Sequence, residues 1–385
     1  MHWRHTASSI EAMPNHDVAL VISDLRGGGA QRVLVTLAEA WQKVGRRVAL
    51  ITLSDPRDDF FHMPESVTRI VIGGIADSNT MLGGLVANLR RILRLRRALR
   101  HARAPVAVAF VMPTAVLTWF AGWGLDLRIV ASERNDPSRQ SFGPVWDWLR
   151  RFTYRRADLV TANSRGALAY LASFVPKNKL VYLANPLPPA RSSASVRLEA
   201  PTIMSIGRLH RQKAHDVLLK AFSIFCAKHY DWRLAIMGVG SEEMPLRALA
   251  ERLKIGERID WLGQKADPYP WLCASKIFAL SSRYEGTPNA LLEAMSCGLP
   301  CVVSNASHGP LDLIENGITG LVVPVEDYAT LAAALDRLAT DEKLAVALGA
   351  AARKKAQLHA AELILNSWDA ALGLKAEQSH TEIRP

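Results

Sequence analysis

The sequence predicts an α/β protein of two Rossmann-like domains that face each other across a cleft. The chain has 385 residues, which is too long for one ordinary hydrophobic core. Short apolar segments that predict buried strands alternate with helical segments through both halves of the chain. Between the halves, residues 188–200 are rich in proline and serine and predict a linker.

The linker separates two predicted domains, residues 17–187 and 201–371. Residues 1–16 lack the apolar stretch of a signal peptide, so we expect a disordered leader before the first strand. Two terminal helices, at about 327–340 and 341–371, are expected to complete the second domain. Residues 372–385 predict a loose tail.

The first domain opens with a pattern typical of nucleotide binding. A strand at Asp17–Ser23 precedes three glycines, a helix at about 30–44 and a strand at Arg47–Leu53. This order is the start of a nucleotide-binding βαβ unit. The dinucleotide motif G-x-G-x-x-G is incomplete, because Arg32 stands where its third glycine would be. Asp55 fits a ribose-binding acid, so a dehydrogenase remains an alternative.

Two cations stand near the start of the second domain. A strand at Thr202–Ile206 leads into a loop with Gly207 and Arg208, and Lys213 follows at the start of a helix. Two cations beside a helix N-terminus suit a diphosphate group. An isolated Arg–Lys pair would be surface charge, but the loop context and the acidic motif downstream favour a binding role.

The stretch Arg283–Ser304 predicts an anion site. A buried strand is expected before it at Lys276–Leu280, and a helix is expected from residue 288 to residue 297. Thr287 can cap this helix and Gly298 can end it. A helix that begins after a loop directs free N–H groups and a positive dipole end at whatever lies before it. The expected contacts are Gly286, Thr287, Pro288, Asn289 and Ala290.

Two carboxylates flank this anion site. Glu285 lies in the loop, and Glu293 lies on the same helix face as Asn289, so both can reach one ligand. Ionised carboxylates accept hydrogen bonds, which suits the hydroxyl groups of a sugar. For an isolated pair, a surface acid and a solvated helix acid would be the simpler interpretation. As a loop acid, Glu285 is not expected to support the core.

The segment Glu285–Ser304, EGTPNALLEAMSCGLPCVVS, closely resembles the E-x7-E signature of retaining, nucleotide-sugar-dependent glycosyltransferases of family 4, which have the GT-B fold. The resemblance extends from about Val18 to about Ala370. It implies that Glu285 contacts the donor sugar and that Glu293 contacts the ribose of a nucleotide sugar, for which a UDP-sugar is expected. Arg208 and Lys213 match the family's R-x4-K pair, which implies that no metal or other cofactor is needed. Gly28 and Gly29 match its first glycine loop.

The segment Ser132–Pro137, SERNDP, resembles the branch of this family that builds cell-surface glycans on polyprenyl diphosphate. It offers Glu133, Arg134 and Asp136 as acceptor-site candidates, although turn-forming or ion-pairing roles are as consistent with the residues. Two positions depart from the family pattern. Val111–Thr114 lacks the usual histidine, which leaves open the group that helps the acceptor lose its proton, and Ala214 stands where glycine is usual.

Charge and apolar patterning bear on the partners. The formal net charge is +11, which favours a polyanionic partner, yet no nucleic-acid-binding signature is present and no nucleic acid is expected. A basic helix is predicted at Leu82–Arg103, with Arg90, Arg94 and Arg97 on one face. An anionic membrane surface or a lipid diphosphate would suit it, and a solvated charged face is the alternative. No run of ~18 apolar residues predicts a membrane span.

The four cysteines predict buried free thiols in a reducing cytoplasm, with a bridge or metal site at Cys297 and Cys301 as a remote alternative. Together these features predict a metal-independent hexosyltransferase on the cytoplasmic membrane face. Its donor would bind the second domain and its glycan acceptor, lipid-linked, the first. A glycan phosphorylase would need a pyridoxal-binding lysine, which is not evident. A non-catalytic basic adaptor for membranes or nucleic acid is the alternative from another class.

Overall fold

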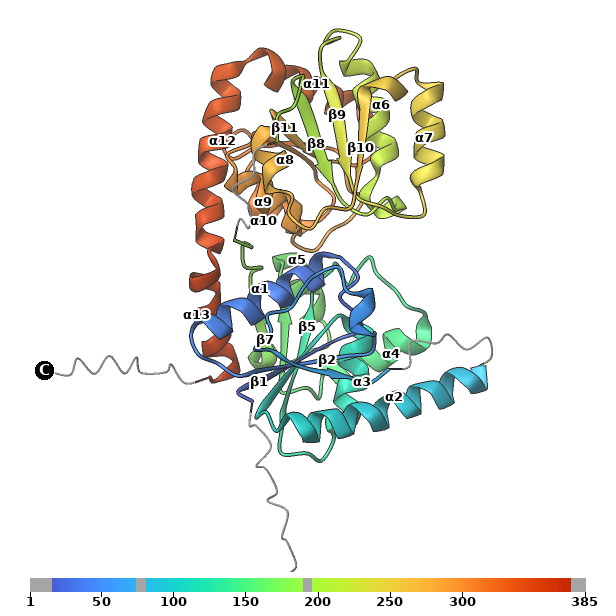
Figure 1. Ribbon diagram of the computed structural model, residues 1–385, viewed down its shortest axis with the longest axis vertical. Coiled ribbons are helices and arrows are strands. Elements are labelled where there is room, and N and C mark those ends of the chain that lie inside the picture. The colour runs from blue at the N-terminus through green and yellow to red at the C-terminus, as the bar shows by residue number, and fades with distance from the viewer. Residues whose placement is uncertain (1–15, 74–80, 190–195, 375–385) are drawn as a thin grey trace, which may run out of the picture.

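The computed structural model describes residues 16–73, 81–189 and 196–374, which form two α/β domains facing each other (Figure 1). The predicted leader before His16, linker residues 190–195 and the tail beyond Leu374 lie outside the described residues. Each domain is a parallel sheet with helices on both faces.

The first sheet has seven parallel strands. In spatial order they are β3 (Thr68–Val71), β2 (Val48–Thr52), β1 (Val18–Ile22), β4 (Val106–Phe110), β5 (Arg128–Glu133), β6 (Leu159–Ala162) and β7 (Leu180–Tyr182). Its helices are α1 (Gly29–Lys43), α2 (Met81–Ala102), α3 (Met112–Gly122), α4 (Pro144–Tyr154) and α5 (Arg165–Leu171). Alternate residues of β1 enter opposite cores: Leu20 packs with α1, and Val21 packs with α2 and α3.

The second sheet has six parallel strands. In spatial order they are β10 (Ile259–Gly263), β9 (Arg233–Met237), β8 (Thr202–Ile206), β11 (Ile277–Leu280), β12 (Cys301–Ser304) and β13 (Leu321–Val323). Its helices are α6 (His215–Phe225), α7 (Glu243–Arg252), α8 (Tyr269–Ala274), α9 (Asn289–Ser296), α10 (His308–Leu313), α11 (Tyr328–Thr340) and α12 (Glu342–Ala356). In both sheets the strand order reverses beside the first strand, and ligands bind at such a switch point.

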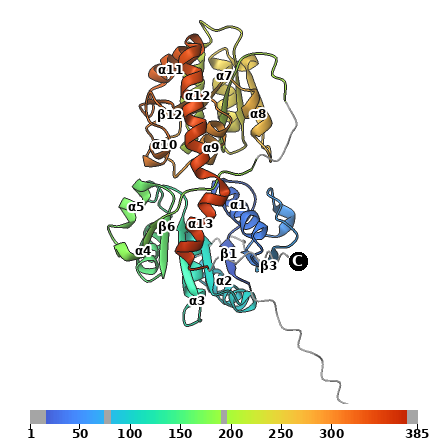
Figure 2. The ribbon, with the colours of Figure 1, turned by 90° about the vertical axis from the view of Figure 1, so that its left-hand side faces the viewer.

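The end of the chain departs from the sequence prediction. Up to Leu374, three helices follow β13 instead of two, and the last, α13 (Ala361–Leu372), packs on the first domain (Figure 2). Trp368 is fully buried there with Trp41 of α1, and the Trp41 indole N–H donates to Asp369 at 2.7 Å. An amphipathic pattern shows that a helix has an apolar face, but it does not show which sheet that face covers.

The cysteines also differ from the prediction. Cys301 is buried, but Cys273 is exposed, and Cys226 and Cys297 are half-buried. All four are free thiols, as predicted, so the alternative bridge between Cys297 and Cys301 is wrong. The Sγ atoms of Cys273 and Cys297 lie 2.9 Å apart. Among residues 16–73, 81–189 and 196–374, every helix falls short of the length or the apolarity that crossing a bilayer requires.

Candidate functional site

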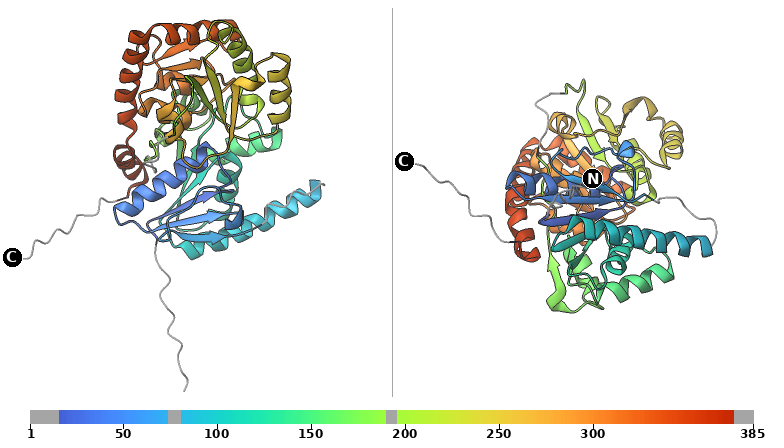
Figure 3. Two further views of the ribbon diagram at one scale, coloured as in Figure 1. Left: turned by 45° about the horizontal axis from the view of Figure 1, so that its top comes forward. Right: turned by 60° about the horizontal axis from the view of Figure 1, so that its bottom comes forward.

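A cavity of about 540 Å³ lies where loops of the two domains meet. Figure 3 shows the two domains from two further directions, with the second domain turned toward the viewer on the left and the first domain turned toward the viewer on the right. The lining includes all twelve residues expected at the donor site: Gly28, Gly29, Gly207, Arg208, Lys213, Glu285, Gly286, Thr287, Pro288, Asn289, Ala290 and Glu293. Glu133 and Arg134 also line it, whereas Asp136, Arg90, Arg94 and Arg97 are not part of its lining.

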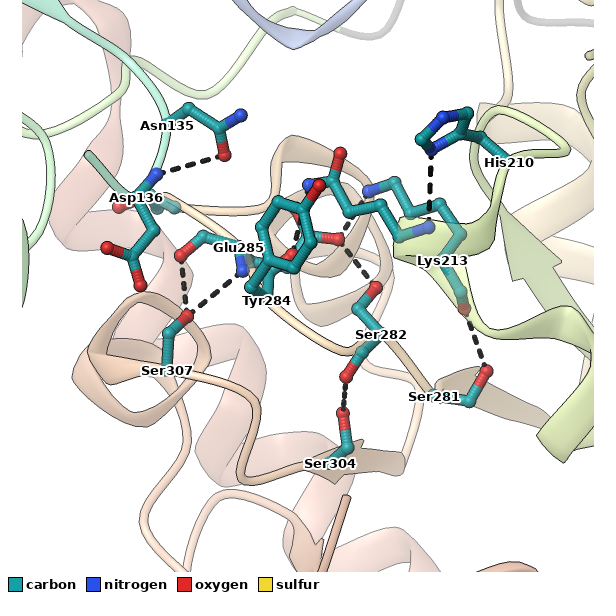
Figure 4. Close-up of polar contacts among 12 residues, drawn as sticks. Asn135, Asp136, His210, Lys213, Ser281, Ser282, Tyr284, Glu285, Ser304 and Ser307 are labelled. Atoms are coloured by element: carbon teal, nitrogen blue, oxygen red, sulfur yellow. Dashed lines mark hydrogen bonds and ion pairs between the residues drawn. The ribbon is translucent and has the colours of Figure 1, made fainter. Parts of the chain in front are cut away.

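Glu285 is held in place by a polar network (Figure 4). Lys213 Nζ donates to Glu285 Oε1 at 2.5 Å, and Ser282 Oγ donates to the same oxygen at 2.6 Å. Ser307 Oγ accepts a hydrogen bond from the Glu285 backbone N–H at 3.0 Å. The side chain is therefore buried and paired, and the expectation of a loop acid without a structural role is wrong.

The two cations of the second domain differ in surroundings. Lys213 is largely buried, and its carbon chain passes so close to Gly207 that a Cβ there would lie 3.0 Å from it. The next residue, Ala214, adopts the left-handed conformation at φ 51°, which glycine would adopt with less strain. Arg208 is exposed to the cavity and makes no ion pair with any described residue.

Helix α9 begins against the first domain. Its N-cap is Pro288, so Thr287 is not the cap; the Thr287 hydroxyl instead donates to the carbonyl oxygen of Asn163. Asn289 Nδ2 donates to the Gly29 carbonyl at 2.8 Å, and Asn185 Nδ2 donates to Asn289 Oδ1 at 2.7 Å. These bonds bring the glycine loop of the first domain to the anion-binding end of α9.

A buried ion pair joins the domains beside this point. Arg32 of α1 contacts Glu293 Oε1 through Nε at 3.2 Å and Nη2 at 3.1 Å, and Arg32 Nη1 donates to the Ala266 carbonyl at 3.1 Å. Burial raises the pKa of Glu293, and the Arg32 guanidinium opposes this shift. In the sequence, Arg32 stands out only because it occupies the place of the third glycine of a dinucleotide motif. Its closeness to Gly28 and Gly29 is the one local sign that it lies near the donor site.

The acceptor-site candidates separate into three roles. Burial raises the pKa of Glu133, whose Oε2 accepts a hydrogen bond from the Tyr154 hydroxyl at 3.2 Å. Arg134 is enclosed by the first domain, with its guanidinium 4.8 Å from the Trp368 ring centre, and burial lowers its pKa to about 9. Asp136 accepts from the backbone N–H and hydroxyl of Ser138 and forms a turn. Of the two acids, Glu133 is the one that lines the cavity, and the acceptor roles of all three residues stay predictions.

The arginines of α2 lie away from the cavity. Arg90, Arg94 and Arg97 are exposed, while Leu95 and Leu99 are buried against the sheet. Arg94 Nη1 donates to the Ile72 carbonyl at 3.3 Å. Their position excludes direct contact with a donor in the cavity.

Comparison with known proteins identifies the family. Residues 28–186 match the family described as "Glycosyl transferase 4-like domain", and residues 190–355 match "Glycosyl transferases group 1". An uncharacterized glycosyltransferase of Haemophilus influenzae is 31% identical over 345 residues, which cover 89% of this chain and 95% of the relative. The chain therefore belongs to the group 1 glycosyltransferases, with a first domain of the family 4-like type. It is therefore expected to be an enzyme, as the sequence predicted.

Further relatives agree with this assignment. An N-acetylgalactosamine-N,N'-diacetylbacillosaminyl-diphospho-undecaprenol 4-alpha-N-acetylgalactosaminyltransferase of Campylobacter jejuni is 26% identical over 352 residues, or 88% of this chain and 94% of the relative. The structure of Anabaena HepE with UDP-glucose superposes with a TM-score of 0.78 at 17% identity, covering 93% of this chain and 100% of HepE. Two Rossmann-like domains in this arrangement confirm the predicted GT-B fold.

Replacing Arg32 with alanine should favour an open cleft. The change leaves the Glu293 carboxylate without its cation, and breaking a buried pair costs about 3 kcal/mol unless water reaches the remaining charge. Opening of the domains admits that water, so small-angle X-ray scattering should report a larger radius of gyration. Adding Glu293→Gln should reverse part of the change, because a neutral amide is less costly to bury. An unchanged scattering curve for the single variant would contradict this role.

Replacing Glu133 with glutamine should alter how stability depends on pH. A carboxyl group whose pKa is raised by folding holds its proton more tightly in the folded state, so its contribution is complete below the ordinary value of 4.5 and is lost as pH rises through the folded pKa. Urea unfolding should therefore show the glutamine variant gaining stability relative to the parent above pH 4.5. The Tyr154→Phe variant lacks the hydrogen bond that lowers the pKa of Glu133. In this variant the loss of stability with rising pH should therefore extend to higher pH. Parallel pH profiles for the parent and Glu133→Gln would overturn the interpretation.

Proposed function

We propose that this glycosyltransferase moves a hexose or N-acetylhexosamine from a UDP-sugar to a glycan on a polyprenyl diphosphate, with retention of anomeric configuration and without a metal. The observation that carries the proposal is the convergence of Arg208, Lys213 and the N-terminus of α9 beside two buried carboxylates in one cavity. Cations and N–H groups suit a diphosphate, and the carboxylates suit sugar hydroxyls.

The cations act on the leaving group. As the bond between the anomeric carbon and the diphosphate oxygen breaks, negative charge develops on the diphosphate, and Arg208 and Lys213 stabilise it. The acceptor hydroxyl attacks from the same face, and its proton passes to a diphosphate oxygen. Because two positioned cations already neutralise this charge, the reaction needs no metal ion.

The carboxylates position the donor. Glu285 orients the sugar, with Lys213 and Ser282 fixing its Oε1. Glu293 binds the ribose; Arg32 occupies its Oε1, and its Oε2 accepts no hydrogen bond from the described residues. The free oxygen is therefore available to a ribose hydroxyl, which donates to it.

The acceptor binds the first domain near Glu133. Two Campylobacter jejuni relatives have names that specify sugar transfer to undecaprenyl-diphosphate-linked glycans, and this supports a lipid-linked acceptor for this chain. With such an acceptor, we propose a peripheral protein on the cytoplasmic face of the membrane. Glu133 is buried, lines the cavity and lies at the end of β5, where it can accept a hydrogen bond from an acceptor hydroxyl.

A donor screen tests the proposal. Four UDP-sugars, carrying glucose, galactose and their N-acetylated forms, are compared by thermal shift, and the donor that stabilises the protein is then supplied with a polyprenyl-diphosphate-linked sugar. Because all four donors have an axial, α-linked sugar, an α linkage in the NMR spectrum of the product supports retention. An inverted product, or transfer only to unlinked glycans, overturns the corresponding part.

Replacing Glu285 with alanine should lower the rate of transfer by at least about 100-fold, because the sugar loses a group that orients it in the transition state. Since Lys213 also loses its partner, the melting temperature should fall as well. Glu285→Gln keeps the volume and separates the two effects: it should fold well and still transfer slowly. A fully active glutamine variant would remove Glu285 from the donor site.

Arg208→Ala and Lys213→Ala should each cost roughly 2–4 kcal/mol of transition-state stabilisation, measured as a loss of kcat/KM. The effect of Arg208 should appear without loss of stability, because its side chain makes no ion pair with the described residues. Exposed Arg252, at the end of α7, provides a matched control. The parent enzyme should remain fully active in EDTA, and activity that returns only with Mn²⁺ or Mg²⁺ would contradict metal independence.

A further inference from the structure

The outer surface of α2 carries apolar side chains as well as arginines. Leu85, Leu89 and Leu93 follow one another at four-residue spacing and are 69%, 56% and 50% exposed. Side chains at this spacing share one face of a helix. Single exposed leucines are common on protein surfaces, but a row of them is unusual. Such a row indicates a contact with something outside the domain.

Exposed tryptophans lie on the neighbouring helices. Trp123 at the end of α3 is 69% exposed, and Trp148 on α4 is 59% exposed. The Trp123 ring stacks on Trp119 with centroids 5.7 Å apart, Trp119 meets the edge of Phe152 at 5.6 Å, and Phe152 stacks on Trp148 at 5.4 Å. The two exposed rings are thus the ends of one rigid aromatic row.

One arginine connects the two features. Arg96 Nη1 donates to the carbonyl oxygens of Ala121 at 2.9 Å and Trp123 at 2.6 Å, which fixes the middle of α2 beside the end of α3. Figure 1 shows α2 along the end of the first domain that lies far from the second domain, with α3 beside it. We call this region the α2–α4 surface; its apolar members that are at least half exposed are Leu85, Leu89, Leu93, Trp123, Val145 and Trp148.

The charge on α2 and the segment that follows it has a single sign. From Met81 to Leu125 the chain has seven arginines and neither aspartate nor glutamate. Two copies of this chain that met through the same surface would bring these arginines face to face, which disfavours a symmetric dimer. Acids on this surface are few: Asp126 follows the segment, and Asp147 of α4 pairs with Arg150. A surface with apolar rows, tryptophans and a large excess of arginines matches the headgroup region of an anionic bilayer.

We propose that the α2–α4 surface docks on an anionic phospholipid bilayer, with its leucines and tryptophans among the acyl-chain boundary and Arg90, Arg94 and Arg97 at the lipid phosphates. The inference deepens the proposed function, on which it rests for the identity of the acceptor. It explains the exposed ends of the aromatic row, which donor binding in the cavity does not explain. It also accounts for a basic helix that lies outside the cavity.

Vesicle sedimentation with the full chain tests this surface. The vesicles are pure phosphatidylcholine or contain 30 mol% phosphatidylglycerol, and binding is expected only to the second kind and to weaken with added salt. Replacing Arg90, Arg94 and Arg97 with serine should weaken binding on the order of a hundredfold. Replacing Trp123 and Trp148 with serine should weaken it by about tenfold per ring. Serine at Arg252, Lys343 and Lys354, exposed cations of the second domain, is the matched charge control.

The outcomes separate this inference from the proposed function. The variants should keep full transfer to a water-soluble short-chain prenyl-diphosphate acceptor, because the surface lies outside the cavity. If the parent binds vesicles but transfers to no lipid-linked acceptor, the docking surface stands and the proposed function fails. If the arginine and tryptophan variants bind vesicles as the parent does, the inference is wrong. It is also wrong if the surface instead mediates self-association, seen as a concentration-dependent mass that the tryptophan variant loses.

Discussion

The buried ion pair between Arg32 and Glu293 is the contact on which the geometry of the cleft depends. It joins the first helix of one domain to the helix whose N-terminus forms the anion site of the other. The pair is shielded from water, so either charge alone would be costly. The closed arrangement and the proposed donor site are therefore coupled: a ribose at Glu293 meets a carboxylate that the opposite domain already orients.

The second buried pair, between Lys213 and Glu285, is better explained by ligand binding than by stability. Desolvation makes such pairs weak contributors to stability, and well-packed apolar residues could replace them without loss. Their retention is understandable if a diphosphate and a sugar need both charges at that point. Ser282 adds a hydrogen bond to the same carboxylate oxygen, and Ser307 holds the loop backbone, so the side chain is positioned before any ligand arrives.

The sequence was sufficient for features encoded by neighbouring residues. The βαβ opening, the loop before α9 and the buried face of α2 all follow from local patterns, because apolar periodicity and glycine or proline punctuation determine them. Contacts between distant residues were not accessible in this way. Arg32 and Glu293 are 261 positions apart, and nothing local to Arg32 indicates an acidic partner. The exposure of side chains could not be predicted in this way either. Trp123 and Trp148 are large apolar residues of the kind that cores bury, and only the fold shows that they face outward.

The misassigned terminal helix has a structural consequence for the site. Trp368 of α13 stacks beneath Arg134, whose Nη1 donates to Asn185 Oδ1 at 3.1 Å; Asn185 in turn bonds Asn289 at the start of α9. The chain also crosses between domains twice at one place, because the Leu187 N–H donates to the His359 carbonyl at 2.7 Å, just before α13. The helix that ends the chain therefore braces both the crossing point and the loop that receives α9. A change in the packing of Trp368 would reach the anion site through Arg134 and Asn185, although neither residue belongs to the second domain.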